Sequence, residues 1–275
     1  MLKKRINKIV LLLVLLIASS GISSDTIGKG FQKPKDVSFI SKSDSTEQRY
    51  ILLLPEEFNP NTLHNVLIAL HGHGHGRWQF ATADIDQGRA ARDVAAEYNM
   101  IFVSPDYRAK TSWMGPKAEA DLVQIINDLK KEYKVAKVFL TGGSMGGTSS
   151  LTFAALHPNL IAGVAAMNGS ANLLEFRNYQ DAIIKSFGGT KEQIPLVYKQ
   201  RSAEYWPEKL TMPLGITLSG KDTKVSPKSV MRLIKVLKAI GHKEIKVIFR
   251  PEMGHTTKYD DAKAIIEFIL KDETK

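Results

Sequence analysis

The stretch VFLTGGSMGGTSSLTF, Val138–Phe153, decides which fold this sequence predicts. Its apolar beginning predicts a strand and its second half predicts a helix. Between them Ser144 lies in a G-x-S-x-G pattern that runs from Gly142 to Gly146. A serine on a sharp turn from strand to helix raises its hydroxyl above the sheet edge, while the first amides of the helix point at developing negative charge. The glycines leave clearance for this turn, so the stretch predicts a nucleophilic serine.

Strands and helices alternate along the rest of the chain. Apolar and β-branched runs predict strands at residues 36–41, 49–55, 65–72, 100–106, 137–143, 163–169, 213–220 and 245–251. Helical spacing predicts helices at residues 84–98, 116–132, 145–157, 226–240 and 257–271. Several strands are apolar at consecutive positions, as expected where helices cover both faces of a sheet. We therefore expect one α/β domain over residues 36–273, with a mostly parallel eight-stranded sheet and an antiparallel edge.

Residues 170–209 do not fit this alternation. The segment is too long for a plain connection between two strands, and we expect it to form a small helical insertion above the sheet.

A serine hydroxyl becomes an effective nucleophile when a base takes its proton, and the sequence offers seven histidines. Functional groups gather at the carboxyl ends of parallel strands. Six histidines lie at the amino end of a strand, at the end of a helix, or in a loop before the serine: His64, His71, His73, His75, His157 and His242. His255, in FRPEMGH, follows the last strand and is the predicted base. The alternative is a loop histidine that faces solvent.

An acid should orient the histidine and stabilise its cation. Asp222, in TLSGKDTKVSP, follows the penultimate strand and gives the order serine, aspartate, histidine. It could instead be a turn residue or a helix cap, in which case Glu252 is the candidate acid.

Two backbone amides are expected to bind the oxyanion. Met145 follows the serine and supplies one amide, and the loop LHGHGHGR supplies the other, most directly from His73. The three alternating histidines of this loop also suggest a metal site, although no acidic run or fourth ligand accompanies them. The loop LHGHGHGR does not match a dinucleotide-binding loop, because Arg77 stands where the third glycine would be. The stretch around Ser144 does not match a phosphate-binding P-loop, because it contains no G-K-[ST].

The beginning of the chain reads as an export signal. A basic head precedes the apolar run IVLLLVLLIA and the small residues SSGISS, which predicts a signal peptide over residues 1–20 and a secreted or periplasmic protein. An uncleaved membrane anchor is the alternative. The net charge is +10, and the chain has no cysteine. Its basic stretches resemble solvated helix faces without a nucleic-acid-binding motif.

The motifs LHGHG, VSPDYR, TGGSMGG, SGKDTKVSP and MGH resemble, in this order, the functional loops of the α/β-hydrolase superfamily. GGSMGG is similar to the corresponding motif of secreted feruloyl and acetylxylan esterases, of the esterase D group and of the prolyl oligopeptidase catalytic domain. The resemblance implies an α/β-hydrolase fold in which Ser144, His255 and Asp222 are catalytic and the amides of Met145 and His73 bind the oxyanion. It implies no metal and no cofactor.

The leading hypothesis from the sequence is a secreted serine esterase that forms an acyl-enzyme, acting on a small-molecule or polysaccharide-linked ester. A serine peptidase of prolyl oligopeptidase type and a non-catalytic binding protein are the alternatives. Three tryptophans in loops or in the insertion are candidates for stacking on the substrate, and ordinary packing is the competing interpretation: Trp78, Trp113 and Trp206. The sequence does not indicate the oligomeric state.

Overall fold

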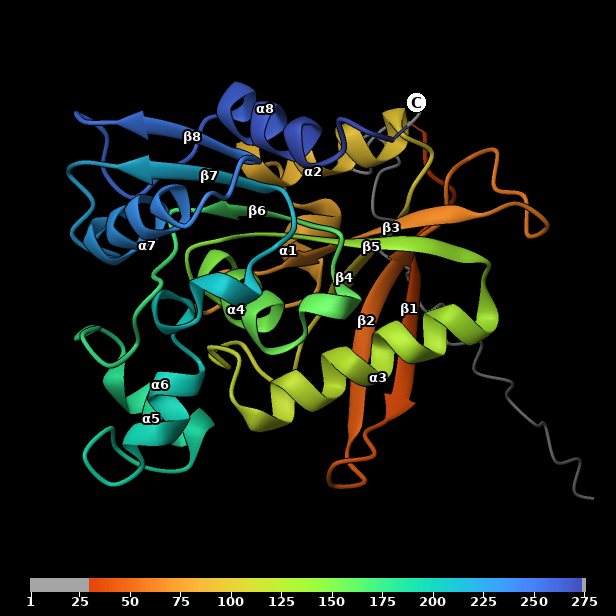
Figure 1. Cartoon of the computed structure of the whole chain (residues 1–275). Coiled ribbons are helices and arrows are strands. Elements are labelled where there is room, and N and C mark those ends of the chain that lie inside the picture. The colour runs from red at the N-terminus through yellow and green to blue at the C-terminus, as the bar shows by residue number, and fades with distance from the viewer. Residues whose placement is uncertain (1–29, 274–275) are drawn as a thin grey trace, which may run out of the picture.

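Eight strands form one sheet, and helices cover both of its faces (Figure 1). The computed structural model describes residues 30–273, so the predicted signal peptide lies outside the described residues. The strand order is β1-β2-β4-β3-β5-β6-β7-β8. The strands are β1 (Lys35–Ile40), β2 (Glu47–Leu53), β3 (His64–Leu70), β4 (Ile101–Pro105), β5 (Val135–Gly143), β6 (Gly163–Met167), β7 (Leu214–Ser219) and β8 (Ile245–Arg250).

The strand directions confirm the predicted mixed sheet. β1 pairs antiparallel with β2, and β2 pairs antiparallel with β4. From β4 to β8 all neighbouring strands are parallel. Parallel strands need long crossovers, and the helices between them provide these connections. The carboxyl ends of β3, β5, β6, β7 and β8 therefore lie along one edge of the sheet.

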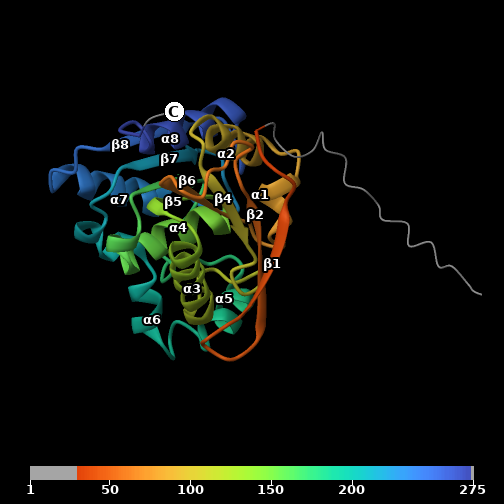
Figure 2. The ribbon, with the colours of Figure 1, turned by 90° about the vertical axis from the view of Figure 1, so that its right-hand side faces the viewer.

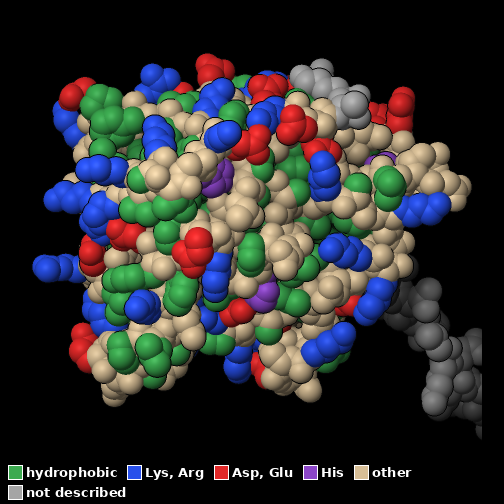
Figure 3. All heavy atoms as spheres, viewed as in Figure 1, with side chains coloured by type: hydrophobic (Ala, Val, Ile, Leu, Met, Phe, Trp, Pro, Cys, Tyr) green, Lys and Arg blue, Asp and Glu red, His purple; other side chains and the backbone are tan. Residues whose placement is uncertain are grey.

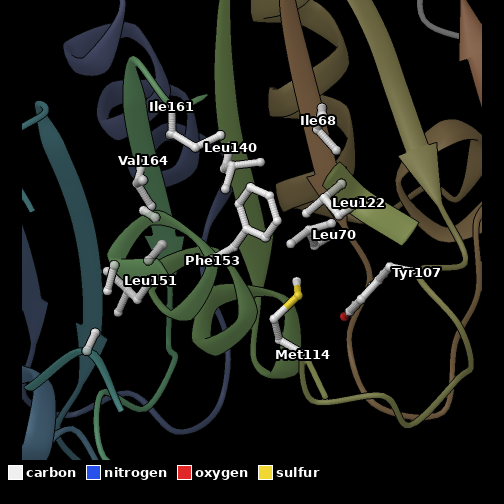
Figure 4. Close-up of a cluster of buried hydrophobic side chains, with 14 of the residues drawn as sticks. Ile68, Leu70, Tyr107, Met114, Leu122, Leu140, Leu151, Phe153, Ile161 and Val164 are labelled. Carbon is white, nitrogen blue, oxygen red and sulfur yellow. The ribbon is translucent and has the colours of Figure 1, made fainter. Parts of the chain in front are cut away.

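Both faces of the sheet are buried, and the residues of β3 divide between them. Val66, Ile68 and Leu70 belong to one apolar cluster, whereas Leu67 and Ala69 belong to the other. Alternate side chains of a strand point to opposite faces, so a run of consecutive apolar residues is what two covered faces require. Figure 4 shows part of the first cluster, where side chains from the strands meet those of the helices on that face.

The helices form two outer layers. One apolar cluster contains residues of α3, α4 and α7, and the other contains residues of α1, α2 and α8. Four of the predicted helices appear with ends within two residues of expectation, and the fifth, residues 116–132, coincides with α3. The short α1 was not predicted from the sequence. The bounds are α1 (Trp78–Thr82), α2 (Asp86–Glu97), α3 (Pro116–Glu132), α4 (Met145–Leu156), α7 (Lys228–Ala239) and α8 (Tyr259–Ile269).

The segment between β6 and β7 forms short helices, as predicted for residues 170–209. Both views place α5 and α6 at the end of the molecule opposite α8 (Figure 1 and Figure 2). The elements are α5 (Gln180–Phe187), α6 (Pro195–Gln200) and the 3-10 turns η2 (Pro158–Leu160), η3 (Ala203–Tyr205) and η4 (Pro207–Lys209), of which η2 precedes the insertion.

An ion pair attaches this insertion to the body of the domain. Arg201, at the end of α6, is 5% exposed and donates to the carboxylate of Glu119 on α3. The imidazole of His157 lies 2.8 Å from the other oxygen of that carboxylate. Burial raises the pKa of Glu119, but the hydrogen bonds from His157 and Arg201 outweigh burial and lower this pKa below its ordinary value.

Replacing Glu119 by alanine is expected to lower the free energy of unfolding by about 2–3 kcal/mol, because Arg201 keeps its buried charge without a partner. Because the pKa of Glu119 is lower in the folded state, its stabilisation is present above the ordinary value of 4.5 and is lost as the pH falls through the folded-state value. Urea unfolding at neutral and acidic pH measures both effects.

Glu208→Ala serves as the control, since Glu208 is an exposed residue of the same insertion. Equal stability losses for Glu119→Ala and Glu208→Ala would show that the buried pair does not anchor the insertion.

Charged side chains are dispersed over the surface. On the face shown in Figure 3, lysine and arginine side chains are spread out and interspersed with aspartate and glutamate. Within residues 30–273, no helix combines the length and the apolar character that crossing a membrane requires.

Candidate active site

Ser144 occupies the turn between β5 and α4 in an unusual backbone conformation. Its φ is 59° and its ψ is −118°, a combination that residues with a side chain rarely adopt. The Ser144 amide donates to the carbonyl of Met167 on β6 at 2.8 Å, which ties the turn to the sheet. A Cβ atom at Gly146 would lie 1.9 Å from the carbonyl oxygen of Leu70 at the end of β3. Glycine at this position is therefore required by the close approach of the turn to β3.

His255 connects Ser144 to Asp222. Its Nε2 atom lies 2.8 Å from the Ser144 hydroxyl oxygen, and its Nδ1 atom lies 2.6 Å from Oδ2 of Asp222. The three residues come from the loops that follow β5, β7 and β8, as the sequence predicted. The Asp222 side chain is 1% exposed. The structure thus brings together the three residues that the sequence identified, in the hydrogen-bonded order of a serine hydrolase.

The other oxygen of Asp222 is held by the backbone. Its Oδ1 accepts hydrogen bonds from the amides of Lys224 and Val225, both at 2.9 Å. These two bonds leave Oδ2 directed at His255. The alternative acid, Glu252, has a side chain that is 78% exposed and pairs with Lys221. His255 instead forms its hydrogen bond with Asp222, so the geometry favours Asp222 as the acid.

Asn168 stabilises the loop that carries His255, and the sequence prediction did not include it. Its side-chain amide donates to the carbonyl of Thr256 at 2.6 Å, and its Oδ1 accepts from Ser219 at 3.3 Å. The residue has a φ of 46° and directly follows β6. A polar residue in that position, at the carboxyl end of a buried strand, was the available sequence signal. Asn168 holds the residue after His255 without touching His255 itself.

The two predicted oxyanion donors lie on segments that pack together. Met145 is the first residue of α4, where helical amides have no acceptor within the helix. The loop after β3 is fixed beside the turn, because the Tyr107 hydroxyl donates to the carbonyl of His71 at 2.6 Å and the Gly72 amide donates to Gln79 at 2.7 Å. The oxyanion role of the His73 and Met145 amides stays a prediction.

The three histidines of this loop have different surroundings. His71 is fully buried, and burial lowers its pKa. His73 accepts a hydrogen bond from the indole of Trp113 at 3.0 Å, and burial lowers its pKa as well. His75 is exposed. Within residues 30–273, no three histidine, aspartate, glutamate or cysteine side chains are grouped so that they could hold a metal ion.

A cavity of about 400 Å³ opens beside Ser144 and His255. It is lined by His75, Gln79, Ile85, Asp86, Gln87, Ser144, Met167, Asn168, His255, Thr256 and Thr257. Three of the polar side chains in this lining, those of Gln79, Asp86 and Gln87, come from α1 and α2. The sequence prediction missed Gln79 and Gln87, because it did not include α1 and did not place the start of α2 near the serine.

None of the three candidate tryptophans lines this cavity. Trp113 is fully buried and packs against Phe176 and Tyr179 of the insertion. These contacts favour the competing interpretation, in which Trp113 packs the insertion on the domain, over stacking on a substrate. Trp206 donates its indole N–H to the carbonyl of Lys199. Trp78 is half-buried in α1 and packs on the second apolar cluster.

Comparison with known proteins identifies related sequences and folds. The family model described as prolyl oligopeptidase family matches residues 104–271. The fold is similar to that of an acylaminoacyl peptidase from Pyrococcus horikoshii, with a TM-score of 0.66, 18% identity, and coverage of 87% of this chain and 40% of that chain. This chain thus spans about two fifths of the length of that peptidase.

Two smaller hydrolases match over almost their whole length. One is a ferulic acid esterase, with a TM-score of 0.66, 17% identity, and coverage of 86% of this chain and 97% of that chain. The other is the fluorophosphonate-binding serine hydrolase F of Staphylococcus aureus, with a TM-score of 0.64, 17% identity, and coverage of 86% and 98%. At these identities the similarity demonstrates a shared α/β-hydrolase fold.

Proposed function

We propose that this chain, which belongs to the prolyl oligopeptidase family of serine hydrolases, is a carboxylic ester hydrolase that works through Ser144, His255 and Asp222. The observation that carries the proposal is the continuous hydrogen-bonded path from the serine hydroxyl through the imidazole to the buried carboxylate. A serine hydroxyl is a weak nucleophile, and a histidine held in this way can accept its proton as it attacks.

The reaction would proceed in two halves. The Ser144 oxygen attacks the ester carbonyl carbon as its proton moves to Nε2 of His255, and the amides of Met145 and His73 stabilise the negative oxygen that forms. The ester bond then breaks, His255 returns the proton to the leaving alcohol, and an acyl-serine remains. In the second half, His255 takes a proton from water, the hydroxide attacks the acyl-serine, and the carboxylic acid is released as Ser144 regains its proton.

Asp222 would keep the proton of neutral His255 on Nδ1, so that Nε2 faces Ser144 as an acceptor. It would also stabilise the imidazolium that forms in each half. The dipole of α4 adds positive potential where the oxyanion develops. None of these steps requires a cofactor.

The match to nearly the whole chain of a ferulic acid esterase supports an ester substrate, and acylated saccharides are the substrate class that we propose. A serine peptidase is the second candidate, because the family and the acylaminoacyl peptidase similarity favour it. We also propose that the protein is exported. This part of the proposal rests on the sequence of residues 1–20, which lie outside the described part of the chain.

An ester and an amide with the same acyl group separate these candidates. We expect nitrophenyl acetate to be hydrolysed and the matching nitroanilide to react at least about 100-fold more slowly, because the amine is a poorer leaving group and needs a more exactingly placed proton donor. Aminoacyl nitroanilides extend the test to peptidase substrates. Faster cleavage of an aminoacyl amide than of any ester would favour the peptidase. A protein that neither turns over esters nor reacts with a fluorophosphonate would be a binding protein.

A further inference from the structure

A second cavity adjoins the one beside Ser144. It has a volume of about 570 Å³. The two cavities share His75, Gln79 and Ile85 in their linings. The loop after β3 and the loop after β4 form the walls of the second cavity, and the Gly74 amide donates to the carbonyl of Lys110 at 2.8 Å to join them. A substrate bound at Ser144 can therefore extend into a preformed space.

The leaving group of an ester must reach the first cavity. His255 must give its proton to the leaving oxygen, so the leaving group binds where Ser144 and His255 are both accessible. Both residues line the first cavity, which shares part of its lining with the second. A different cavity, lined by His73 and Tyr179, shares no lining residue with the cavity beside Ser144.

The lining of the second cavity contains three cationic side chains and one carboxylate. Its charged side chains are Arg77, Arg108, Lys110 and Asp106. Arg77 pairs with Asp36 and Asp106, at 2.9 and 2.8 Å. In the neighbouring cavity, Asp86 pairs with Arg89 at 2.6 Å.

Arg108 is also neutralised, by Asp44 at 3.1 Å and Asp121 at 2.9 Å. Among the cations of the second cavity, Lys110 is the one to which the described residues offer no carboxylate within 4.0 Å. Lys110 is exposed, and the half-buried Trp78 lines the same cavity. A lysine without a carboxylate partner among the described residues, in a cavity that an aromatic side chain also lines, suits a sugar that bears a carboxylate.

We propose that the second cavity binds the leaving alcohol of the substrate and that Lys110 selects alcohols bearing a carboxylate, such as an acylated uronic acid. The inference rests on the proposed ester hydrolysis and adds which half of the ester carries the charge. Lys110 acts here as a specificity-determining residue: it attracts the charged alcohol and takes no part in the bond-breaking steps.

Matched synthetic esters test this assignment. Nitrophenyl acetate and carboxynitrophenyl acetate share the acyl group and differ by a carboxylate on the leaving group, whereas the nitrophenyl monoester of succinic acid has its carboxylate on the acyl side. We expect the ratio of kcat/KM for carboxynitrophenyl acetate over nitrophenyl acetate to fall about fivefold or more in Lys110→Glu and less in Lys110→Gln. The ratio for the succinate ester over nitrophenyl acetate should change less than twofold. Added salt should reduce the wild-type preference.

Lys235→Glu is the matched control, because it makes the same charge change at an exposed position on α7. It should leave both ratios at their wild-type values. Equal ratios in the wild type and Lys110→Glu, or an equal fall in Lys235→Glu, would overturn the assignment while leaving ester hydrolysis intact. A larger response of the succinate ester would also overturn it. Absence of hydrolysis of every ester by the wild type would instead contradict the proposed function itself.

Discussion

Replacement of Ser144 by alanine is expected to lower kcat for ester hydrolysis by about 10⁴-fold to 10⁶-fold, because no acyl-enzyme can form without the hydroxyl. The alanine leaves the backbone turn in place, since the Ser144 side chain makes its hydrogen bond to His255 and the amide makes the bond to Met167. Steady-state hydrolysis of nitrophenyl acetate and labelling by a fluorophosphonate measure the loss.

Ser226→Ala is the control for this variant, because Ser226 is exposed and lies in the loop that carries Asp222. It should retain both activity and labelling. Wild-type turnover in Ser144→Ala would mean that another group attacks the ester, and it would refute the mechanism proposed for this site.

Replacement of Asp222 by asparagine is expected to lower kcat by about 10³-fold to 10⁴-fold, because it changes which nitrogen of His255 carries the proton. The amides of Lys224 and Val225 require an acceptor, so the asparagine oxygen will remain with them. The side-chain NH₂ then faces Nδ1 of His255, which must accept that hydrogen bond and carry its proton on Nε2. In this form the imidazole cannot take the proton of Ser144.

Activity of Asp222→Asn should be measured together with its thermal unfolding, because the variant keeps the shape and most hydrogen bonds of the wild type. We expect a large loss of kcat with a small change in stability. Glu252→Gln, at the alternative acid, should keep wild-type activity. The reverse result, an active Asp222→Asn and an inactive Glu252→Gln, would assign the acid to Glu252.

Much of the fold could be predicted from the sequence because local patterns carry it. Consecutive apolar residues in β3 indicated a strand covered on both faces, and residues 116–132 had the spacing of the helix that forms there. The turn at Ser144 could also be predicted from a local pattern. The structure leaves no room there for a Cβ atom, and the sequence shows this requirement directly as glycine.

Other features depended on contacts between distant segments. The short helix α1 has five residues, too few for a periodic pattern, and it is held partly by Arg92, which donates to the carbonyl of Phe80 at 2.7 Å. The cavity beside Ser144 could not be predicted because part of its polar lining comes from α1 and α2. Trp113 was a candidate for stacking on the substrate, with packing as the competing interpretation, and packing of the insertion buries it.

The sequence by itself determined the order of strands and helices, the turn at Ser144, and the candidates His255 and Asp222, because strand periodicity, glycine clearance and position after a strand are local properties. The tertiary structure decided which side chains surround the serine. Hydrogen bonds across the sheet edge place Asn168 beside the loop of His255. Ion pairs between distant segments neutralise Arg77 and Arg108, whereas Lys110 has no carboxylate within 4.0 Å among residues 30–273. These choices depend on distances between segments far apart in the chain, which a linear pattern does not contain.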